Sequence, residues 1–167
     1  MAAAAAHLTG KPQIVMATRT VGAANAAIGI HTARQDSAQL VARIGGVRRE
    51  FRGREAFQES DLASGIGSLA AWSVELERPA DAGRVMGEGI RHLTTGRPGP
   101  ILIALPEDLL DMPAGGHASA APASTGGTSP DRAAVRQILK WLAASRRGAI
   151  IAGGGVLRAR ASKRLMT

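Results

Sequence analysis

The chain has many residues of the types that bind metals or act as nucleophiles, but not at the spacings such chemistry needs. Its four histidines (His7, His31, His92 and His117) are widely separated, so we expect no metal site and read each as a surface or core residue. There are no cysteines, which excludes disulfides and thiolate metal sites. Serines and aspartates are plentiful, yet no nucleophile-elbow pattern is present.

Three short segments remain as candidate sites, and each also has a plain structural interpretation. Gly22 and Asn25 fit a strand-to-helix turn with a capping Asn. In the polar, Arg-rich loop 47–60, Phe57 fits an apolar packing anchor and Gln58 a surface residue. Arg97 fits a cation placed beside the last carbonyls of a helix.

The elements that must position these residues follow from composition and pattern. Hydrophobic residues make up 45% of the 167 residues but only four residues are aromatic, which favours layered α/β packing of Ala, Val, Ile and Leu. Short apolar runs predict strands over 13–18, 39–44, 69–76 and 101–105. Helices are predicted over 2–8, 26–34 and 81–95. This alternation predicts a three-layer α/β fold, with a mostly parallel sheet and helices on both faces.

The second half of the chain differs in composition. Residues 114–130 are almost entirely Ala, Gly, Ser, Thr and Pro, which predicts a linker between a first domain (1–113) and the start of a second (131–167). In the second domain Asp131 is expected to cap a helix, followed by a strand over 148–152 and a further helix. The predicted buried stripe of the capped helix comprises Val135, Ile138, Leu139 and Leu142.

The charge of the chain bears on its partners. The net charge is +8, and 18 of the 21 basic residues are Arg. The basic residues are scattered apart from Arg48, Arg49, Arg52 and Arg54, and they do not alternate with aromatic residues, so we expect no nucleic-acid partner. Salt-sensitive retention of DNA would reverse that expectation. No long apolar segment or signal peptide is evident, so we predict no membrane association and a cytoplasmic location.

Three longer segments place these candidates in a family context. They are TRTVGAANAAIGIHTARQDS (18–37), GGVRREFRGREAFQESD (45–61) and TTGRPGPILIALPEDLL (94–110). In sequence, order and spacing they resemble three consecutive motifs of the acetolactate-synthase-like thiamine-diphosphate enzymes. The similarity covers residues 1–113 and continues weakly into 131–167. It implies a pyrimidine-binding domain followed by the opening of a central domain.

The resemblance implies roles for the candidate residues. In the family this domain holds the aminopyrimidine of thiamine diphosphate, and a separate domain of a partner subunit holds the diphosphate through Mg²⁺. Gly22, Asn25 and Gln58 would then lie on the cofactor side and Phe57 on the substrate side. Arg97 matches an Arg that contacts FAD in the flavin-carrying members.

This sequence departs from the family pattern at several points. Thr20 and Val21 replace a Gly and a Pro, and a β-branched residue is costly wherever φ must be positive. Ala71 stands where acetolactate synthases usually have a Lys. The family's catalytic Glu would fall upstream of Met1, so we expect no catalytic residue within the chain.

These observations predict a piece of a thiamine-diphosphate enzyme that acts on 2-oxo acids by decarboxylation or C–C transfer and is inactive alone. The alternative is a non-catalytic association module that forms dimers or tetramers, because an open sheet edge invites pairing with another chain. For a thiamine site, we predict that residues 18–25, 56–59 and 96–100 meet at one end of the sheet.

Overall fold

The computed structural model describes residues 1–113 and 129–166, which fall into two separate units. The division runs between Ser124 and Thr125. Residues 114–128 lie outside the described part, so the predicted linker and domain boundaries stay predictions. Within the described residues, no helix has the length and apolar character required to cross a membrane.

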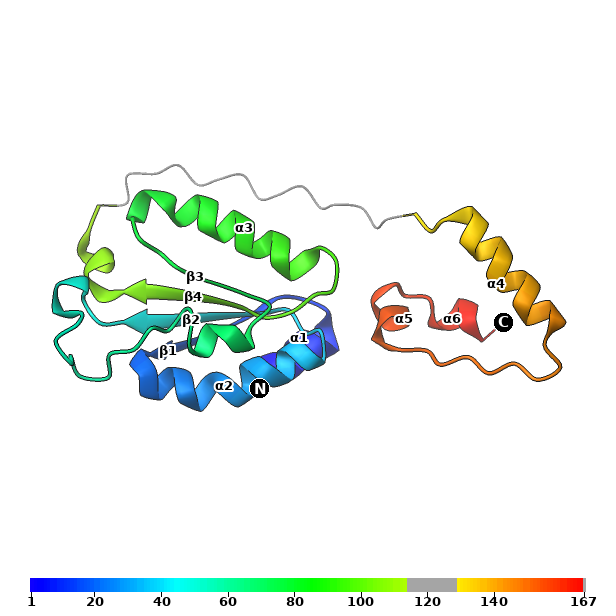
Figure 1. Ribbon diagram of the computed structural model, residues 1–167, viewed down its shortest axis with the longest axis horizontal. Coiled ribbons are helices and arrows are strands. Elements are labelled where there is room, and N and C mark those ends of the chain that lie inside the picture. Colours follow the sequence, from blue (N-terminus) through cyan, green and yellow to red (C-terminus); the bar gives the residue numbers. More distant parts are fainter. Residues whose placement is uncertain (114–128, 167) are drawn as a thin grey trace. The chain divides into compact units, whose positions relative to one another are not determined.

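The first unit is built on a four-stranded sheet whose strands all run parallel (Figure 1). The strands are β1 (Gln13–Thr18), β2 (Leu40–Gly46), β3 (Trp72–Glu75) and β4 (Ile101–Pro106), in the spatial order β1-β2-β4-β3. The two central strands, β2 and β4, are buried along most of their length, as expected for strands covered on both faces. The predicted α/β fold with a parallel sheet is therefore confirmed.

Helices cover both faces of this sheet (Figure 1). On one face lie α1 (Ala2–Thr9), which ends at the left-handed Gly10, and α2 (Arg19–Gln35), packed through small residues such as Ala23 and Ala33. On the other face lies α3 (Ala82–Thr94), packed through larger aliphatic residues such as Val85 and Leu93. Short 3₁₀ turns complete the unit: η1 (Arg49–Phe51), η2 (Ile66–Leu69), η3 (Pro79–Asp81) and η4 (Glu107–Asp111).

Among the described residues, β1 forms one edge of the sheet because its only strand partner is β2. Burial alternates along β1, and the side chains of Ile14 and Met16 are each 65% exposed on its open face. The strand carries no charged residue and no proline, the two features that most often block edge-to-edge pairing.

The second unit contains three helices in its described part: α4 (Arg132–Ala144), α5 (Gly154–Arg158) and α6 (Ser162–Leu165). The predicted cap is confirmed, since the Asp131 carboxylate accepts a hydrogen bond of 2.8 Å from the Ala133 N–H. Two other predictions are wrong. The stripe on α4 is exposed at Val135, Ile138, Leu139 and Leu142, and 148–152 forms no strand. A strand needs a neighbour to satisfy its backbone groups, and the described part of this unit contains none.

Candidate functional site at the carboxyl edge of the sheet

The candidate site lies where the four parallel strands end. Open parallel sheets bind ligands outside the carboxyl ends of their strands. In this chain the loop 47–60, which follows β2, carries Phe57 and Gln58 at that edge. The first turn of α2 follows β1 directly, and η4 follows β4, so both lie at the same edge.

Two of the three predicted segments meet there. The Thr20 hydroxyl donates to the Gln58 carbonyl at 2.7 Å and lies 2.6 Å from the Ser60 hydroxyl. The Thr20 N–H also donates to the Gln58 carbonyl, at 3.4 Å. Beside this contact, Arg19 Nη1 donates to the Phe57 carbonyl at 3.2 Å. The start of α2 thus holds the backbone of the segment that carries Phe57 and Gln58.

The segment 20–25 is helical rather than a loop. Its residues form the first turns of α2, so Gly22 and Asn25 lie within the helix and Asn25 is not a cap. A Cβ on Gly22 would lie 3.2 Å from the Cβ of Ala17, so this glycine permits close packing of α2 against β1. Asn25 is exposed. The interpretation of these residues as a strand-to-helix turn with a capping Asn is therefore wrong, and their cofactor roles stay predictions.

Backbone strain at this edge falls on the candidate Gln58 and on two residues that the sequence did not single out, Arg19 and Glu55. Arg19 (φ 57°), Glu55 (φ 53°) and Gln58 (φ 60°) are non-glycine residues in the left-handed region, at a cost of about 1–2 kcal/mol each. Thr20 and Val21 have no positive φ, so the expected cost of replacing Gly and Pro there does not arise. Arg19 is the residue that sequence reasoning missed, because left-handed Arg has no local signature.

The loop is closed on itself by Glu59. Its carboxylate accepts hydrogen bonds from the Gly53 N–H at 2.7 Å and the Ala56 N–H at 3.0 Å. These backbone hydrogen bonds lower the pKa of Glu59 below its usual value. The closed loop lines an open cavity of about 470 Å³, bordered by Gly53, Glu55, Ala56, Gln58 and Glu59.

Phe57 and Gln58 differ in how they sit on this loop. The Phe57 side chain is 75% exposed, so its interpretation as a packing anchor is wrong. Gln58 is half-buried and lines the cavity. A substrate-side role for Phe57 and a cofactor-side role for Gln58 both stay predictions.

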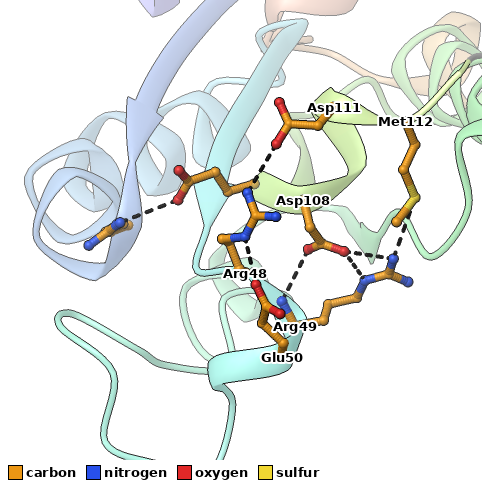
Figure 2. Close-up of polar contacts among 8 residues, drawn as sticks. Arg48, Arg49, Glu50, Asp108, Asp111 and Met112 are labelled. Atoms are coloured by element: carbon orange, nitrogen blue, oxygen red, sulfur yellow. Dashed lines mark hydrogen bonds and ion pairs between the residues drawn. The ribbon is translucent and has the colours of Figure 1, made fainter.

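An ionic cluster ties the start of the loop to η4 (Figure 2). Arg49 Nε and Nη2 each lie 2.7 Å from Asp108 Oδ2, and the Arg49 N–H donates to Oδ1 at 3.1 Å. Arg48 pairs with both Glu50 and Asp111, at 2.9 and 3.0 Å. Burial acts to raise the pKa of Asp108, but its bonds to Arg49 outweigh this and hold that pKa below its usual value.

The ion pairs also explain the local cluster of arginines. Arg48, Arg49 and Arg52 each pair with a carboxylate of the same domain. The cluster is therefore largely neutralised and is not a free basic patch of the kind that binds nucleic acid.

Arg97 lies at the opposite edge of the sheet. Residues 96–100 precede β4, whereas the other two segments follow strands that run in the same direction. Arg97 Nη2 donates to the Gln35 carbonyl at 2.8 Å and Nε to the Ser37 hydroxyl at 2.9 Å. The prediction that all three segments meet is thus wrong for 96–100. Arg97 does bind helix-terminal carbonyls, but those of α2; an FAD contact stays a prediction.

No metal site is evident in residues 1–113 and 129–166, since no three His, Cys, Asp or Glu side chains gather there in a way that could hold an ion. His117 lies outside the described residues.

Known proteins are similar to this chain in sequence and in fold. Residues 1–65 match the thiamine pyrophosphate enzyme N-terminal TPP binding domain. The acetolactate synthase large subunit IlvB1 of Mycobacterium tuberculosis is 32% identical over 167 residues, covering 96% of this chain and 26% of that protein. The acetolactate synthase isozyme 3 large subunit of Escherichia coli is 31% identical over 165 residues, covering 95% and 29%.

A solved structure agrees with this match at the level of the fold. The structure, of a protein from Mycobacterium smegmatis assigned as a thiamin diphosphate-dependent enzyme, superposes with a TM-score of 0.79 at 22% identity. The match covers 87% of this chain and 28% of the solved protein. The chain thus spans little more than a quarter of the length of these relatives. Residues 1–65 therefore match the N-terminal TPP binding domain of the thiamine pyrophosphate enzymes, and the chain as a whole is similar to about a quarter of an acetolactate synthase large subunit.

Proposed function

We propose that the chain supplies the pyrimidine-side half of a thiamine diphosphate site, for an enzyme that decarboxylates 2-oxo acids or transfers a two-carbon unit from them. The observation that carries this proposal is the contact between the β1–α2 junction and Phe57–Gln58 at the carboxyl edge. Gln58 there lines a cavity of about 470 Å³. An aminopyrimidine needs a partner that both donates and accepts hydrogen bonds, and a Gln amide does both.

The residues at this edge fit that half of the cofactor. Thiamine diphosphate, when bound, supplies the carbanion chemistry. Gln58 would orient the ring by its amide, while the exposed Phe57 ring would exclude water from the substrate side. In this proposal Mg²⁺ and the diphosphate are held by residues other than those described, and any FAD would lie near Arg97.

We further propose that the described chain does not catalyse alone. A carboxylate that shares a proton with the pyrimidine is needed, and two of the carboxylates at this edge, Glu59 and Glu107, already have partners. A third, Glu55, borders the cavity but is exposed to solvent. Glu59 accepts from two backbone N–H groups, which lower its pKa, and Glu107 Oε2 pairs with Arg19 at 3.3 Å. A carboxylate with a lowered pKa is a poor proton partner for a weakly basic ring.

Two titrations test the proposal. Calorimetry with thiamine diphosphate and Mg²⁺ should show no micromolar binding, and pyruvate should release no CO₂; micromolar binding or turnover contradicts the claim of inactivity. NMR with millimolar 4-amino-5-hydroxymethyl-2-methylpyrimidine should shift the amides of 53–59, and Gln58→Ala should abolish the shift. Unmoved amides in the unmodified chain would reject the half-site itself.

A second candidate function is self-association as a dimer or tetramer through β1. It is favoured by the uncharged edge of this strand and by the 65% exposure of Ile14 and Met16. Sedimentation at several concentrations should show a dimer that Met16→Lys dissociates, because a charge on an edge strand opposes pairing. A monomer at every concentration would eliminate this candidate.

A further inference from the structure

Hydrogen bonds and ion pairs connect the loop 47–60 to the segments at the ends of β1, β3 and β4. On the β1 side, Thr20 binds the Gln58 carbonyl. On the β3 side, Arg52 Nη1 pairs with Glu75 at 2.7 Å, and Arg49 Nη1 donates to the Glu77 carbonyl at 2.8 Å. The β4 side is fastened by Asp108 and Asp111 of η4, through Arg49 and Arg48 (Figure 2).

Asp108 is the most buried carboxylate among these interactions. Its side chain is 12% exposed, the lowest value for any carboxylate in the ion pairs of the described residues. It accepts from the backbone and the guanidinium of Arg49, so it fixes both the direction of the chain and the side chain at that point. Hydrogen bonds between ionised groups are stronger than neutral ones, and low exposure reduces the screening that weakens ordinary surface pairs.

The fixed position of Arg49 is transmitted to Gln58 by the loop's own closure. The Glu59 carboxylate binds the N–H groups of both Gly53 and Ala56, so residues 53–59 are cross-linked by their own hydrogen bonds. One end of this segment follows Arg49 and Arg52, and the other is held by Thr20. Left-handed Glu55 and Gln58 store strain, and strain persists only while the surroundings hold it in place.

We propose that Asp108 is a positioning residue, which through Arg49 holds the loop 53–59 in the conformation that presents Phe57 and Gln58 at the carboxyl edge. Asp108 touches neither of these two residues. The claim that Asp108 affects ligand binding rests on the proposed function. The claim that Asp108 stabilises the conformation of residues 53–59 does not.

The test compares two Asp→Asn substitutions by amide hydrogen exchange. Asp108→Asn removes the charge that holds Arg49. Asp81→Asn is the matched control, because Asp81 also binds an Arg Nε, at 2.8 Å from Arg78, and its side chain is 20% exposed. We expect exchange of the amides in 53–59 to rise roughly tenfold in Asp108→Asn and to stay within about twofold in Asp81→Asn. Equal exchange in the two variants overturns the proposal.

A second variant keeps the test decisive if Asp108→Asn fails to fold. Arg49→Lys retains the positive charge but loses the two-pronged geometry, so it should fold and loosen 53–59 to a smaller extent. Unchanged exchange in Arg49→Lys would then count against the proposal.

The ligand readout separates this inference from the proposed function. With the same pyrimidine as the NMR probe, Asp108→Asn should weaken the shifts at 53–59 while Asp81→Asn leaves them intact. If the pyrimidine causes no NMR shifts in the unmodified chain but amide exchange in 53–59 rises in Asp108→Asn, the proposed function is rejected. The claim that Asp108 stabilises this loop is then still supported. Full shifts despite a loosened loop show that Asp108 does not position the ligand site.

Discussion

The two edges of the sheet are built from the same strands but held in different ways. At the amino edge, Arg97 binds oxygens at the end of α2, and Gln39 Nε2 binds the Leu93 carbonyl at 3.0 Å. These bonds satisfy helix ends. Arg97 and Gln39 are not left-handed, and the left-handed non-glycine residue at this edge, Ser37 (φ 55°), directly follows the C-cap of α2. At the carboxyl edge, ion pairs hold a loop that contains left-handed Glu55 and Gln58, next to left-handed Arg19.

This difference distinguishes contacts that only stabilise the fold from contacts that hold a strained conformation. Helix ends need partners in any fold, so the bonds at the amino edge are explained by stability alone. Strained residues raise the energy of the folded state, and they tend to cluster where a conformation is needed for binding or catalysis. Three left-handed non-glycine residues, a cavity and the candidate residues coincide at the carboxyl edge, which is why the proposed function assigns the ligand to that edge.

The largest effect should come from the strand that both edges share. Leu102 in β4 is fully buried, so Leu102→Ala should lower the free energy of unfolding by about 2–5 kcal/mol through lost burial and a cavity. Chemical denaturation measures this, with Leu110→Ala as control because Leu110 is 60% exposed. Hydrogen exchange should rise at both edges together; an effect confined to one edge would mean that they do not share a cooperative core.

The second largest effect should be that low pH destabilises the carboxyl edge before the amino edge. The folded pKa values of Asp108 and Glu59 are lowered, so their stabilisation is present above the pKa of the unfolded chain, about 4. It is lost as pH falls through the folded values. The charged group that acts on Asp108 is Arg49, and the one that acts on Glu59 is Arg52. As the pH is lowered from 6 to 3, amide hydrogen exchange, corrected for its intrinsic pH dependence, should accelerate in 53–59 at a higher pH than it does around Arg97. Simultaneous loosening of both edges would contradict this order.

Removing the amino-edge bonds should cost less. Arg97→Gln loses guanidinium bonds to the Gln35 carbonyl and the Ser37 hydroxyl and should destabilise by about 1 kcal/mol. Arg91→Gln, on the exposed surface of α3, is the matched control and should cost less than about 0.5 kcal/mol. The loop 53–59 should exchange normally in both variants, and a loosened loop would show that the edges are coupled.

The smallest expected effect is a gain. Gln58→Gly removes the left-handed strain while the backbone contact with Thr20 remains, so stability should rise by about 0.5–1 kcal/mol. Gln58→Ala is the control and should be close to neutral, because Ala keeps the strain. Thermal melting of the two variants measures the difference. A loss of stability in Gln58→Gly would show that the side chain, rather than the backbone, stabilises the loop.

Local patterns were enough to place most elements of the first unit. The strands over 13–18 and 101–106 match the predicted runs closely, because short apolar segments bounded by Gly, Pro and polar residues have few other uses. The third strand, Trp72–Glu75, is shorter than the predicted 69–76. Leu69 ends a 3₁₀ turn, and the Ala70 N–H donates back to the Gly67 carbonyl rather than to a neighbouring strand. In α4 the helix was predictable, but its burial was not, because burial depends on what packs against it.

The sequence by itself determined the alternation of strands and helices, the helix stop at Gly10 and the cap at Asp131, because each depends on neighbours along the chain. Only the tertiary structure decided which distant residues meet at each edge. The parallel order sends 96–100 to the amino edge and 56–59 to the carboxyl edge. Likewise, the pairing of Arg49 with Asp108 joins residues 59 positions apart. Such contacts are set by the order of strands in the sheet, which no local pattern contains.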